Sequence, residues 1–287
     1  MPLHESEAGN GALDRLLALY SFLTIIPTGK HDLELAAAAF HTVPLVGATI
    51  GLIAGLAAVI TPATPLFRAA IAVSLIHVLT GLNHMDGFID VSDALAARKN
   101  RSETYRILKE PWKGAYAITS AVIALMLQVG GIESFLSAAL PASAIIYPLS
   151  EIILVSVMAS EAMFIAAKFG RPPEARFSLG RLFIEASVGL DKSVINSAIA
   201  SGLIAGLLVV NFVTGQNTLL ILALSVAIVI ISTISSIVVV RIVHRRIGFV
   251  NGDVLGFTYV VSLTAASVAV GTLSWCLKWW LTWFSGL

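Results

Sequence analysis

Three aspartates, Asp86, Asp90 and Asp93, lie within one short segment of a chain that is otherwise poor in charge. If this segment is helical, Asp90 lies roughly 40° from Asp86 around the helix and Asp93 roughly 20° to the other side, so the carboxylates share one face. Carboxylates this close repel one another unless a cation lies between them. A cluster of oxygen ligands suits Mg²⁺ or Mn²⁺ better than zinc. The spacing therefore predicts a Mg²⁺ site, and the alternative is a solvated helix face, which an apolar chain makes costly.

Two polar residues immediately precede this acidic segment. His84 is a candidate general acid or base, or a hydrogen-bond donor to phosphate, and the alternative is a packed or interfacial histidine. Asn83 is a candidate substrate-binding residue.

A second segment, with sequence LKEPWKGAY, precedes a long apolar stretch. Its proline and glycine predict a tight turn at the start of a helix, which is a place suited to anions. Lys109 and Lys113 add positive charge, so we expect these lysines, Glu110 and Gly114 to contact a phosphate-bearing substrate. The alternative is that the lysines only set the orientation of the chain in a membrane.

A third segment, with sequence NGDVLG, opens the last apolar stretch. Asn251 and Gly252 predict a turn that contacts substrate, and Asp253 is expected in the first turn of a helix, where a capping role alone would explain it. A fourth carboxylate on the same membrane face as the other three would complete a metal site or act as a base. Acidic residues with basic, glycine-containing turns favour phosphoryl-group chemistry. Walker A, Ser-His-Asp and HExxH patterns are absent from the sequence.

The composition places these segments in a membrane protein. Hydrophobic residues make up 57% of the 287 residues and charged residues 12%, and mean hydropathy is +0.90. We expect an all-α integral membrane protein, a single polytopic domain over residues 1–287, whose first 42 residues form a cytoplasmic or interfacial segment. The stretch Leu13–Ile26 is expected to be a short interfacial or re-entrant helix. A removable signal peptide is not expected.

Seven apolar stretches are long enough to cross a hydrocarbon core of about 30 Å. They are Val43–Ile60, Leu66–Leu82, Ala115–Ile132, Ser143–Ala167, Val194–Val213, Leu219–Val240 and Val254–Trp275. With the N-terminus in the cytoplasm, all but two of the 18 lysines and arginines fall on the cytoplasmic side. The three candidate segments are then on that side of the cell membrane. Glycines at four-residue spacing, Gly47, Gly51 and Gly55, predict close packing of helices without a chemical role.

The separated segments together resemble the cobalamin synthase family, also called adenosylcobinamide-GDP ribazoletransferase or cobalamin-5′-phosphate synthase. The resemblance covers nearly the whole chain and rests on five segments in order: FLTIIP at 22–27, PLVGATIG at 44–51, TGLNHMDGFIDVSDAL at 80–95, ILKEPWKGAYA at 107–117 and GDVLG at 252–256. In this chain Ala94, Glu110 and Phe257 depart from the family pattern, which bears on substrate detail more than on reaction class.

The resemblance implies a Mg²⁺-dependent transferase that assembles the nucleotide loop of a corrinoid. A ribose hydroxyl of α-ribazole or its 5′-phosphate attacks the phosphate attached to adenosylcobinamide in adenosylcobinamide-GDP, and GMP leaves. The metal ligands are then expected to be Asp86, Asp90 and Asp93, with His84 or Asp253 assisting proton transfer.

Two other classes of membrane protein share part of this pattern. A CDP-alcohol phosphotransferase shares the membrane setting, but its longer aspartate pattern is absent. An ion-coupled transporter would place acids near the middle of the bilayer, whereas these cluster at one edge. The net charge of +1 disfavours a nucleic-acid partner. A homo-oligomer is compatible with the sequence.

Overall fold

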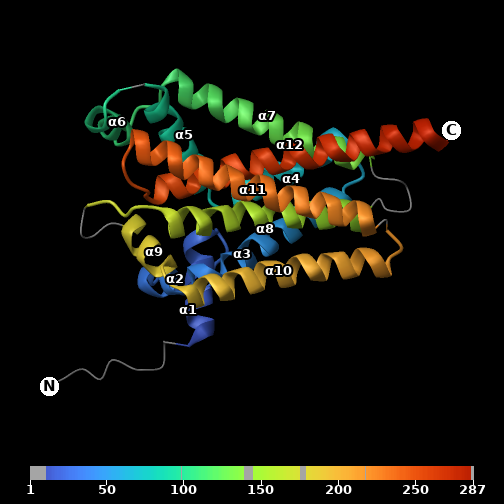
Figure 1. The fold of residues 1–287 in the computed structure, drawn as a ribbon, viewed down its shortest axis with the longest axis horizontal. Coiled ribbons are helices and arrows are strands. Elements are labelled where there is room, and N and C mark those ends of the chain that lie inside the picture. The colour runs from blue at the N-terminus through green and yellow to red at the C-terminus, as the bar shows by residue number, and fades with distance from the viewer. Residues whose placement is uncertain (1–10, 98, 139–144, 175–178, 217, 286–287) are drawn as a thin grey trace.

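The protein is an all-α membrane protein, and the computed structural model describes residues 11–97, 99–138, 145–174, 179–216 and 218–285. Six helices in this part of the chain are each long and apolar enough to cross a membrane. They are α3 (Val43–Ile60), α7 (Ala115–Ala138), α8 (Ile146–Phe169), α10 (Leu190–Val213), α11 (Thr218–Arg246) and α12 (Gly252–Ser285). Figure 1 shows the long helices running alongside one another as a bundle.

A sharp break interrupts the second predicted span. Helices α4 (Pro65–Leu79) and α5 (Asn83–Ala96) meet at a bend of 90°, and counting them as one span brings the described helices to the predicted seven. The connection contains two residues with left-handed backbone angles, Gly81 at φ 62° and Leu82 at φ 60°. The predicted span Leu66–Leu82 thus ends at Leu79, and the acidic segment forms a helix of its own.

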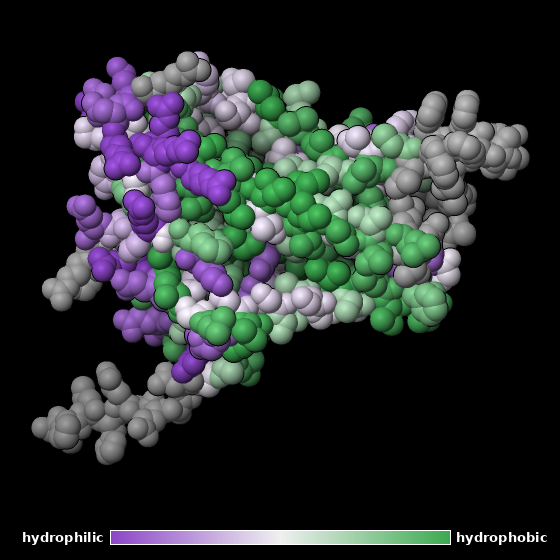
Figure 2. Space-filling model, viewed as in Figure 1, coloured by the Kyte–Doolittle hydropathy of each residue, from purple (hydrophilic) through white to green (hydrophobic). Residues whose placement is uncertain are grey.

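Short helices gather at one end of the bundle, together with α5 (Figure 1). They are α1 (Ala12–Leu23), α2 (Leu33–Ala38), the 3₁₀ helix η2 (Phe40–Thr42), α6 (Arg101–Leu108) and α9 (Leu179–Ser187). Figure 2 shows hydrophilic residues concentrated at this same end, while hydrophobic residues cover most of the remaining visible surface. The molecule therefore has one polar end and a long apolar body, as a helical bundle in a bilayer requires.

The predicted boundaries of the spans agree with the helices to different degrees. The stretch Val43–Ile60 coincides with α3, and the predicted short helix from Leu13 corresponds to α1. Helices α11 and α12 are longer than predicted, because backbone hydrogen bonding continues after a helix leaves the apolar stretch. The predicted start of the fourth span at Ser143 lies outside the described residues.

Helix α8 is the centre of the bundle, because 78% of its 18-residue apolar stretch is buried. Helix α10 is peripheral, with 17% of the corresponding stretch buried. The glycine stripe of α3 packs directly on α8. An added Cβ would lie 2.6 Å from the Ser156 carbonyl oxygen at Gly47, and 2.7 Å from the Ile153 Cα at Gly51. Real side chains do not fit at these distances, so the stripe fixes a close helix contact, as the sequence predicted.

A chain of buried polar side chains links three other helices. Gln128 of α7 is fully buried and shares a hydrogen bond of 2.7 Å with Nε2 of His77 in α4. Its amide nitrogen donates to Thr264 of α12 at 2.8 Å. Such bonds satisfy polar groups where no water is present and hold α4, α7 and α12 in a fixed relation.

Candidate active site

The candidate site lies where α5 crosses the start of α12, and two glycines make the crossing close. A Cβ added to Gly87 of α5 would lie 2.6 Å from the carbonyl oxygen of Asp253. A Cβ added to Gly256 of α12 would lie 3.0 Å from the Cα of His84. Each helix thus contributes a glycine that accommodates a candidate catalytic residue of the other. Two segments far apart in the sequence are brought together in this way.

Two of the three aspartates on α5 surround one lysine. The ammonium of Lys113 contacts the carboxylate of Asp90 and lies 3.9 Å from that of Asp86. The Asp90 side chain is 14% exposed, while that of Asp86 is 70% exposed. Burial alone would lower the pKa of Lys113, but the hydrogen bond and negative charge of Asp90 outweigh burial and raise it. The site therefore contains a permanent positive charge between two carboxylates.

The third aspartate, Asp93, faces the start of α7. Its carboxylate accepts hydrogen bonds from the backbone amides of Gly114 and Ala117, the latter at 3.0 Å. A Cβ on Gly114 would lie 2.7 Å from both carboxylate oxygens, so a larger residue here would displace the Asp93 carboxylate from the α7 amides. An acid at the positive end of a helix is stabilised there, and Asp93 thereby fixes α7 and the Lys113 loop beside α5.

The start of α12 places Asp253 near a second lysine. The side-chain oxygen of Asn251 accepts a hydrogen bond from the Val254 amide at 3.1 Å and caps the helix. Its amide group donates to the Asp253 carboxylate at 2.8 Å. The ammonium of Lys109 lies 3.8 Å from the same carboxylate. Asp253 is thus in the first turn, as predicted, with a lysine and an amide as neighbours.

The remaining predicted residues differ in how close they lie to this centre. His84 is buried, with its ring 4.4 Å from that of Tyr259 between centroids. His84, Asn83 and Gly252 line the same cavity as Asp86 and Asp253. Glu110 does not line this cavity. Its carboxylate lies 3.7 Å from the guanidinium of Arg106, four residues earlier.

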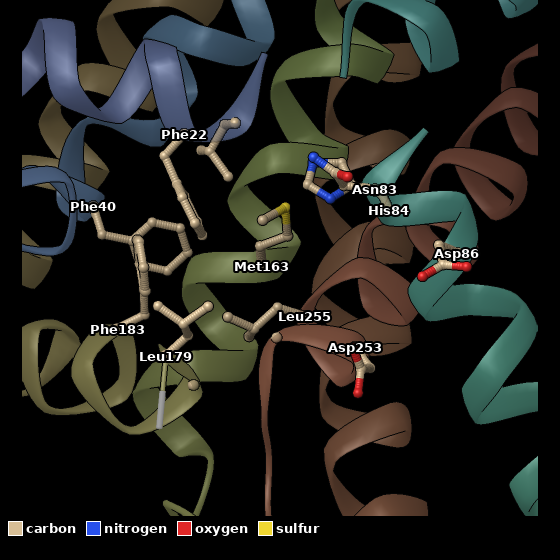
Figure 3. Close-up of a pocket in the computed structure, with 13 residues that line it drawn as sticks. Phe22, Phe40, Asn83, His84, Asp86, Met163, Leu179, Phe183, Asp253 and Leu255 are labelled. Atoms are coloured by element: carbon tan, nitrogen blue, oxygen red, sulfur yellow. The ribbon is translucent and has the colours of Figure 1, made fainter. Parts of the chain in front are cut away.

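The cavity itself has a volume of about 320 Å³ and two unlike walls. In Figure 3, Asn83, His84, Asp86 and Asp253 lie on one side and three phenylalanines on the other, with Met163 and Leu255 between them. The phenylalanines come from three short elements: Phe22 from α1, Phe40 from η2 and Phe183 from α9. We call these two sides the acidic wall and the aromatic wall. Asp90 does not line the cavity, and we count it with the acidic wall because Lys113 contacts both Asp90 and Asp86. The aromatic wall was not predicted from the sequence.

A divalent metal ion fits this donor set in part. No group of three histidine, cysteine or acidic side chains is arranged to hold a metal ion among the residues that the structure describes. Asp86 and Asp90, however, both approach the ammonium of Lys113, so one cation already lies beside their carboxylates, whereas Asp93 faces the amides of Gly114 and Ala117. Mg²⁺ in enzymes commonly takes one or two carboxylates and completes its shell with water and substrate phosphates. Asp86 and Asp90 would therefore suffice as protein ligands for such an ion.

The fold and the site together define a polytopic membrane protein with a mixed acidic and basic centre at the polar end of its helical bundle. A sequence model of the family described as cobalamin-5-phosphate synthase matches residues 15–271. The chain belongs to this family, which confirms the resemblance drawn from its separated segments.

Curated relatives cover most of the chain. A protein of Clostridium perfringens named adenosylcobinamide-GDP ribazoletransferase is 28% identical over 84% of this chain and 90% of its own length. Proteins of the same name are 28% identical in Methanopyrus kandleri, over 90% of this chain and 98% of the relative, and 25% identical in Methanosarcina mazei, over 91% and 93%. No solved structure matches the chain.

Proposed function

We propose that this chain is an adenosylcobinamide-GDP ribazoletransferase of the membrane. It joins adenosylcobinamide-GDP to α-ribazole, or to α-ribazole 5′-phosphate, and releases GMP. The observation that supports this most directly is the convergence of the α5 and α12 segments, which carried the family resemblance, on one cavity that holds acids and is flanked by lysines. An activity built on a pyrophosphate needs this combination of charges.

The proposed reaction is a displacement at phosphorus. A ribose hydroxyl oxygen of α-ribazole forms a bond to the phosphorus that carries adenosylcobinamide, and the bond from that phosphorus to the GMP oxygen breaks. The hydroxyl proton passes to a base in the site, and GMP departs with the bonding electron pair. The products are the joined corrinoid nucleotide and GMP, so neither an oxidant nor a reductant is required.

The side chains of the site have distinct parts in this scheme. Lys109 and Lys113 bind the pyrophosphate oxygens, and their partners Asp253 and Asp90 hold them in place before substrate arrives. Such a preorganised charge stabilises the transition state most when water is excluded. Asp253 and His84 both line the cavity, and we propose one of them as the acceptor of the hydroxyl proton. Asn83, Asn251 and Gly252 complete the substrate contacts.

We propose Mg²⁺ as the cofactor, held by Asp86 and Asp90 with Asp93 beside them. When bound, the ion supplies charge neutralisation on the pyrophosphate. The oxygen-only donor set supports this choice over zinc or copper. Asp93 additionally positions Lys113 by anchoring the start of α7.

We further propose that the polar end of the bundle faces the cytoplasm of a cell whose plasma membrane holds the protein. The excess of lysine and arginine in the loops at this end supports that orientation. It would also place the site where soluble nucleotide substrates are available. This orientation is tested by introducing a cysteine into α6 and labelling cells with a thiol reagent that cannot cross the membrane. A cytoplasmic cysteine is expected to react only after the cells have been permeabilised.

The experiment that tests the activity measures GMP release by purified protein in lipid or detergent, with adenosylcobinamide-GDP and α-ribazole phosphate. We expect GMP to form with a matching amount of corrinoid product, and only when Mg²⁺ is supplied. Absence of turnover by well-folded protein would reject the proposal. Turnover of CDP-alcohol substrates in the same preparation would point to the other phosphotransferase class.

A further inference from the structure

The aromatic wall has no part in the phosphoryl chemistry proposed above, although it lines the same cavity. Phe22 and Phe183 are stacked, with centroids 4.7 Å apart and ring planes at 20°. Phe40 meets Phe183 edge to face, with centroids 5.1 Å apart. Phe40 and Phe183 are buried at 1% and 2% exposure, whereas Phe22 is only partly buried. Phe22 is thus the accessible member of a cluster that its neighbours hold in place.

The rest of this wall provides no polar side chain. Leu23 and Leu179 complete it, and its one further contributor, Gly180, has no side chain. Met163, between the two walls, is apolar as well. A ligand group that binds here must therefore be flat or apolar and must not need hydrogen bonds from side chains. Aromatic rings prefer to stack in offset or edge-to-face arrangements, and they bury a large apolar area when they do.

The size and polarity of the cavity distinguish between the ring systems of the substrates. The corrin macrocycle of adenosylcobinamide is far larger than a cavity of about 320 Å³. The guanine of the GDP group is small enough, but its edge carries several donors and acceptors that would lose their hydrogen bonds against phenylalanine and leucine. The base of α-ribazole is dimethylbenzimidazole, a flat bicycle with two methyl groups and no hydrogen-bond donor. It matches the wall in shape and in polarity.

We propose that the aromatic wall is the binding site for the base of α-ribazole, and that Phe22 determines specificity for it. This inference rests on the proposed function. With the base against Phe22, the attached ribose extends toward the acidic wall, where Asp253 and His84 lie across the same cavity (Figure 3). The two walls would thus bind the two ends of one nucleoside and direct its hydroxyl group to the reacting phosphate.

The structure ties the two walls to each other. The backbone amide of Ile25, three residues after Phe22, donates to the carbonyl of Leu79 at 2.8 Å, at the break that begins the acidic helix. On the other side, a Cβ on Gly180 of α9 would lie 2.5 Å from the Cα of Asn251. The aromatic elements therefore contact the break before α5 and the turn before α12, and these contacts fix the position of the aromatic wall relative to the acidic wall.

The test compares Phe22→Leu with Phe135→Leu, which changes a fully buried phenylalanine of α7 that does not line the cavity. For Phe22→Leu we expect the KM for α-ribazole to rise about fivefold to tenfold, because an aromatic contact is lost. The KM for adenosylcobinamide-GDP is expected to stay within about twofold, because Phe22 is proposed to contact only the base of α-ribazole. A separate variant, Phe22→Tyr, keeps the aromatic ring and is expected to have a KM for α-ribazole close to that of the wild-type protein.

A second series varies the ligand. The riboside of unsubstituted benzimidazole is expected to bind wild-type protein more weakly than α-ribazole, and Phe22→Leu is expected to reduce this difference. A rise in the KM for adenosylcobinamide-GDP instead would assign the cavity to the nucleotide and overturn the proposal. A loss of folded protein equal to that of Phe135→Leu, with unchanged KM values, would also overturn it by showing a purely structural role.

Direct binding separates this inference from the proposed function. Equilibrium dialysis measures retention of radiolabelled α-ribazole by wild-type and Phe22→Leu protein without any turnover. If GMP is never released yet α-ribazole binds and the substitution weakens binding, the aromatic site stands while the proposed reaction fails. If GMP is released but wild-type and variant retain α-ribazole equally, the reaction stands and the aromatic site fails.

Discussion

The acidic wall and the aromatic wall of the cavity are built from different kinds of element and held by different forces. The acidic wall comes from α5 and α12, whose glycines bring the two backbones together, and charge pairs then set its side chains. The aromatic wall comes from the short helices α1, η2 and α9 at the polar end of the bundle, and ring packing holds it together.

This difference predicts a division of labour that can be measured. In the proposed scheme, the acidic wall and its lysines act on the pyrophosphate, so changes there are expected to lower kcat or to raise the KM for adenosylcobinamide-GDP. The aromatic wall is proposed to bind the base of α-ribazole, which does not react, so changes there are expected to raise the KM for α-ribazole. Each of the following predictions tests whether the division holds.

The largest effect is expected for Asp90→Asn. The carboxylate is 14% exposed and contacts Lys113, so its loss removes a candidate metal ligand and leaves the ammonium without its main partner. We expect kcat to fall by about a thousandfold with little change in the KM for α-ribazole. Glu103→Gln, at a first-turn acid of α6 outside the cavity, is the matched control. Unchanged turnover in folded Asp90→Asn protein would contradict the metal assignment.

A smaller loss is expected for Gly87→Ala, which adds one methyl group between the two helices of the acidic wall. The new Cβ would lie 2.6 Å from the Asp253 carbonyl oxygen, so α5 and α12 must separate. A displacement of this kind is expected to lower kcat by about a hundredfold. Gly130→Ala places its methyl group in open space and serves as the control. Equal activity of the two variants would show that the crossing distance is unimportant.

Lys109→Met is expected to have a more modest effect, which is confined to the KM for adenosylcobinamide-GDP. The ammonium lies 3.8 Å from the Asp253 carboxylate and is half exposed, so it can reach a phosphate in solvent. We expect the KM for adenosylcobinamide-GDP to rise about tenfold. Lys99→Met removes an exposed lysine of the same polar end and should leave this KM unchanged. A rise in the KM for α-ribazole instead would break the division between the walls.

The smallest effect is expected for Leu82→Gly, at the break that aims α5 toward the cavity. Leu82 has a left-handed φ of 60°, which glycine adopts at lower cost. We expect the free energy of unfolding to rise by about 1 kcal/mol without a change in kcat. Thermal unfolding in detergent measures the first quantity. A fall in kcat would show that the leucine side chain itself positions the acidic wall.

The sequence singled out most residues of the acidic wall as candidates because they lie in short segments with recognisable spacing, and the structure brings these segments together. Asp86 and Asp90 are four residues apart, and Asn251 to Asp253 form a local turn before a helix. Hydropathy likewise predicted the spans, since about 20 apolar residues leave few alternatives. The break after Leu79 was not predicted, because the apolar stretch continues to Leu82 and only a left-handed backbone angle reveals the end of the helix.

The aromatic wall could not be predicted in the same way. Phe22, Phe40 and Phe183 belong to three short elements far apart in the sequence, and single phenylalanines are ordinary in an apolar chain. The hydrogen bonds from the α7 amides to Asp93 were not predicted for a similar reason, since a contact between distant residues leaves no periodic signal. A clue existed in Gly114, where a Cβ would lie 2.7 Å from the Asp93 carboxylate oxygens.

The close contact between α3 and α8 also has a consequence for how the protein is made. Helix α8 carries two buried acids, Glu151 and Glu161, and an acidic residue in a membrane-spanning helix costs up to about 3 kcal/mol, the cost being greatest at its centre. Of the helices that pack extensively on α8 in the described part of the chain, α10, α11 and α12 are synthesised after it, whereas α3 precedes it. The glycine stripe of α3 is therefore the surface that meets α8 during synthesis, and a bulky residue at Gly51 would first reduce the yield of inserted protein.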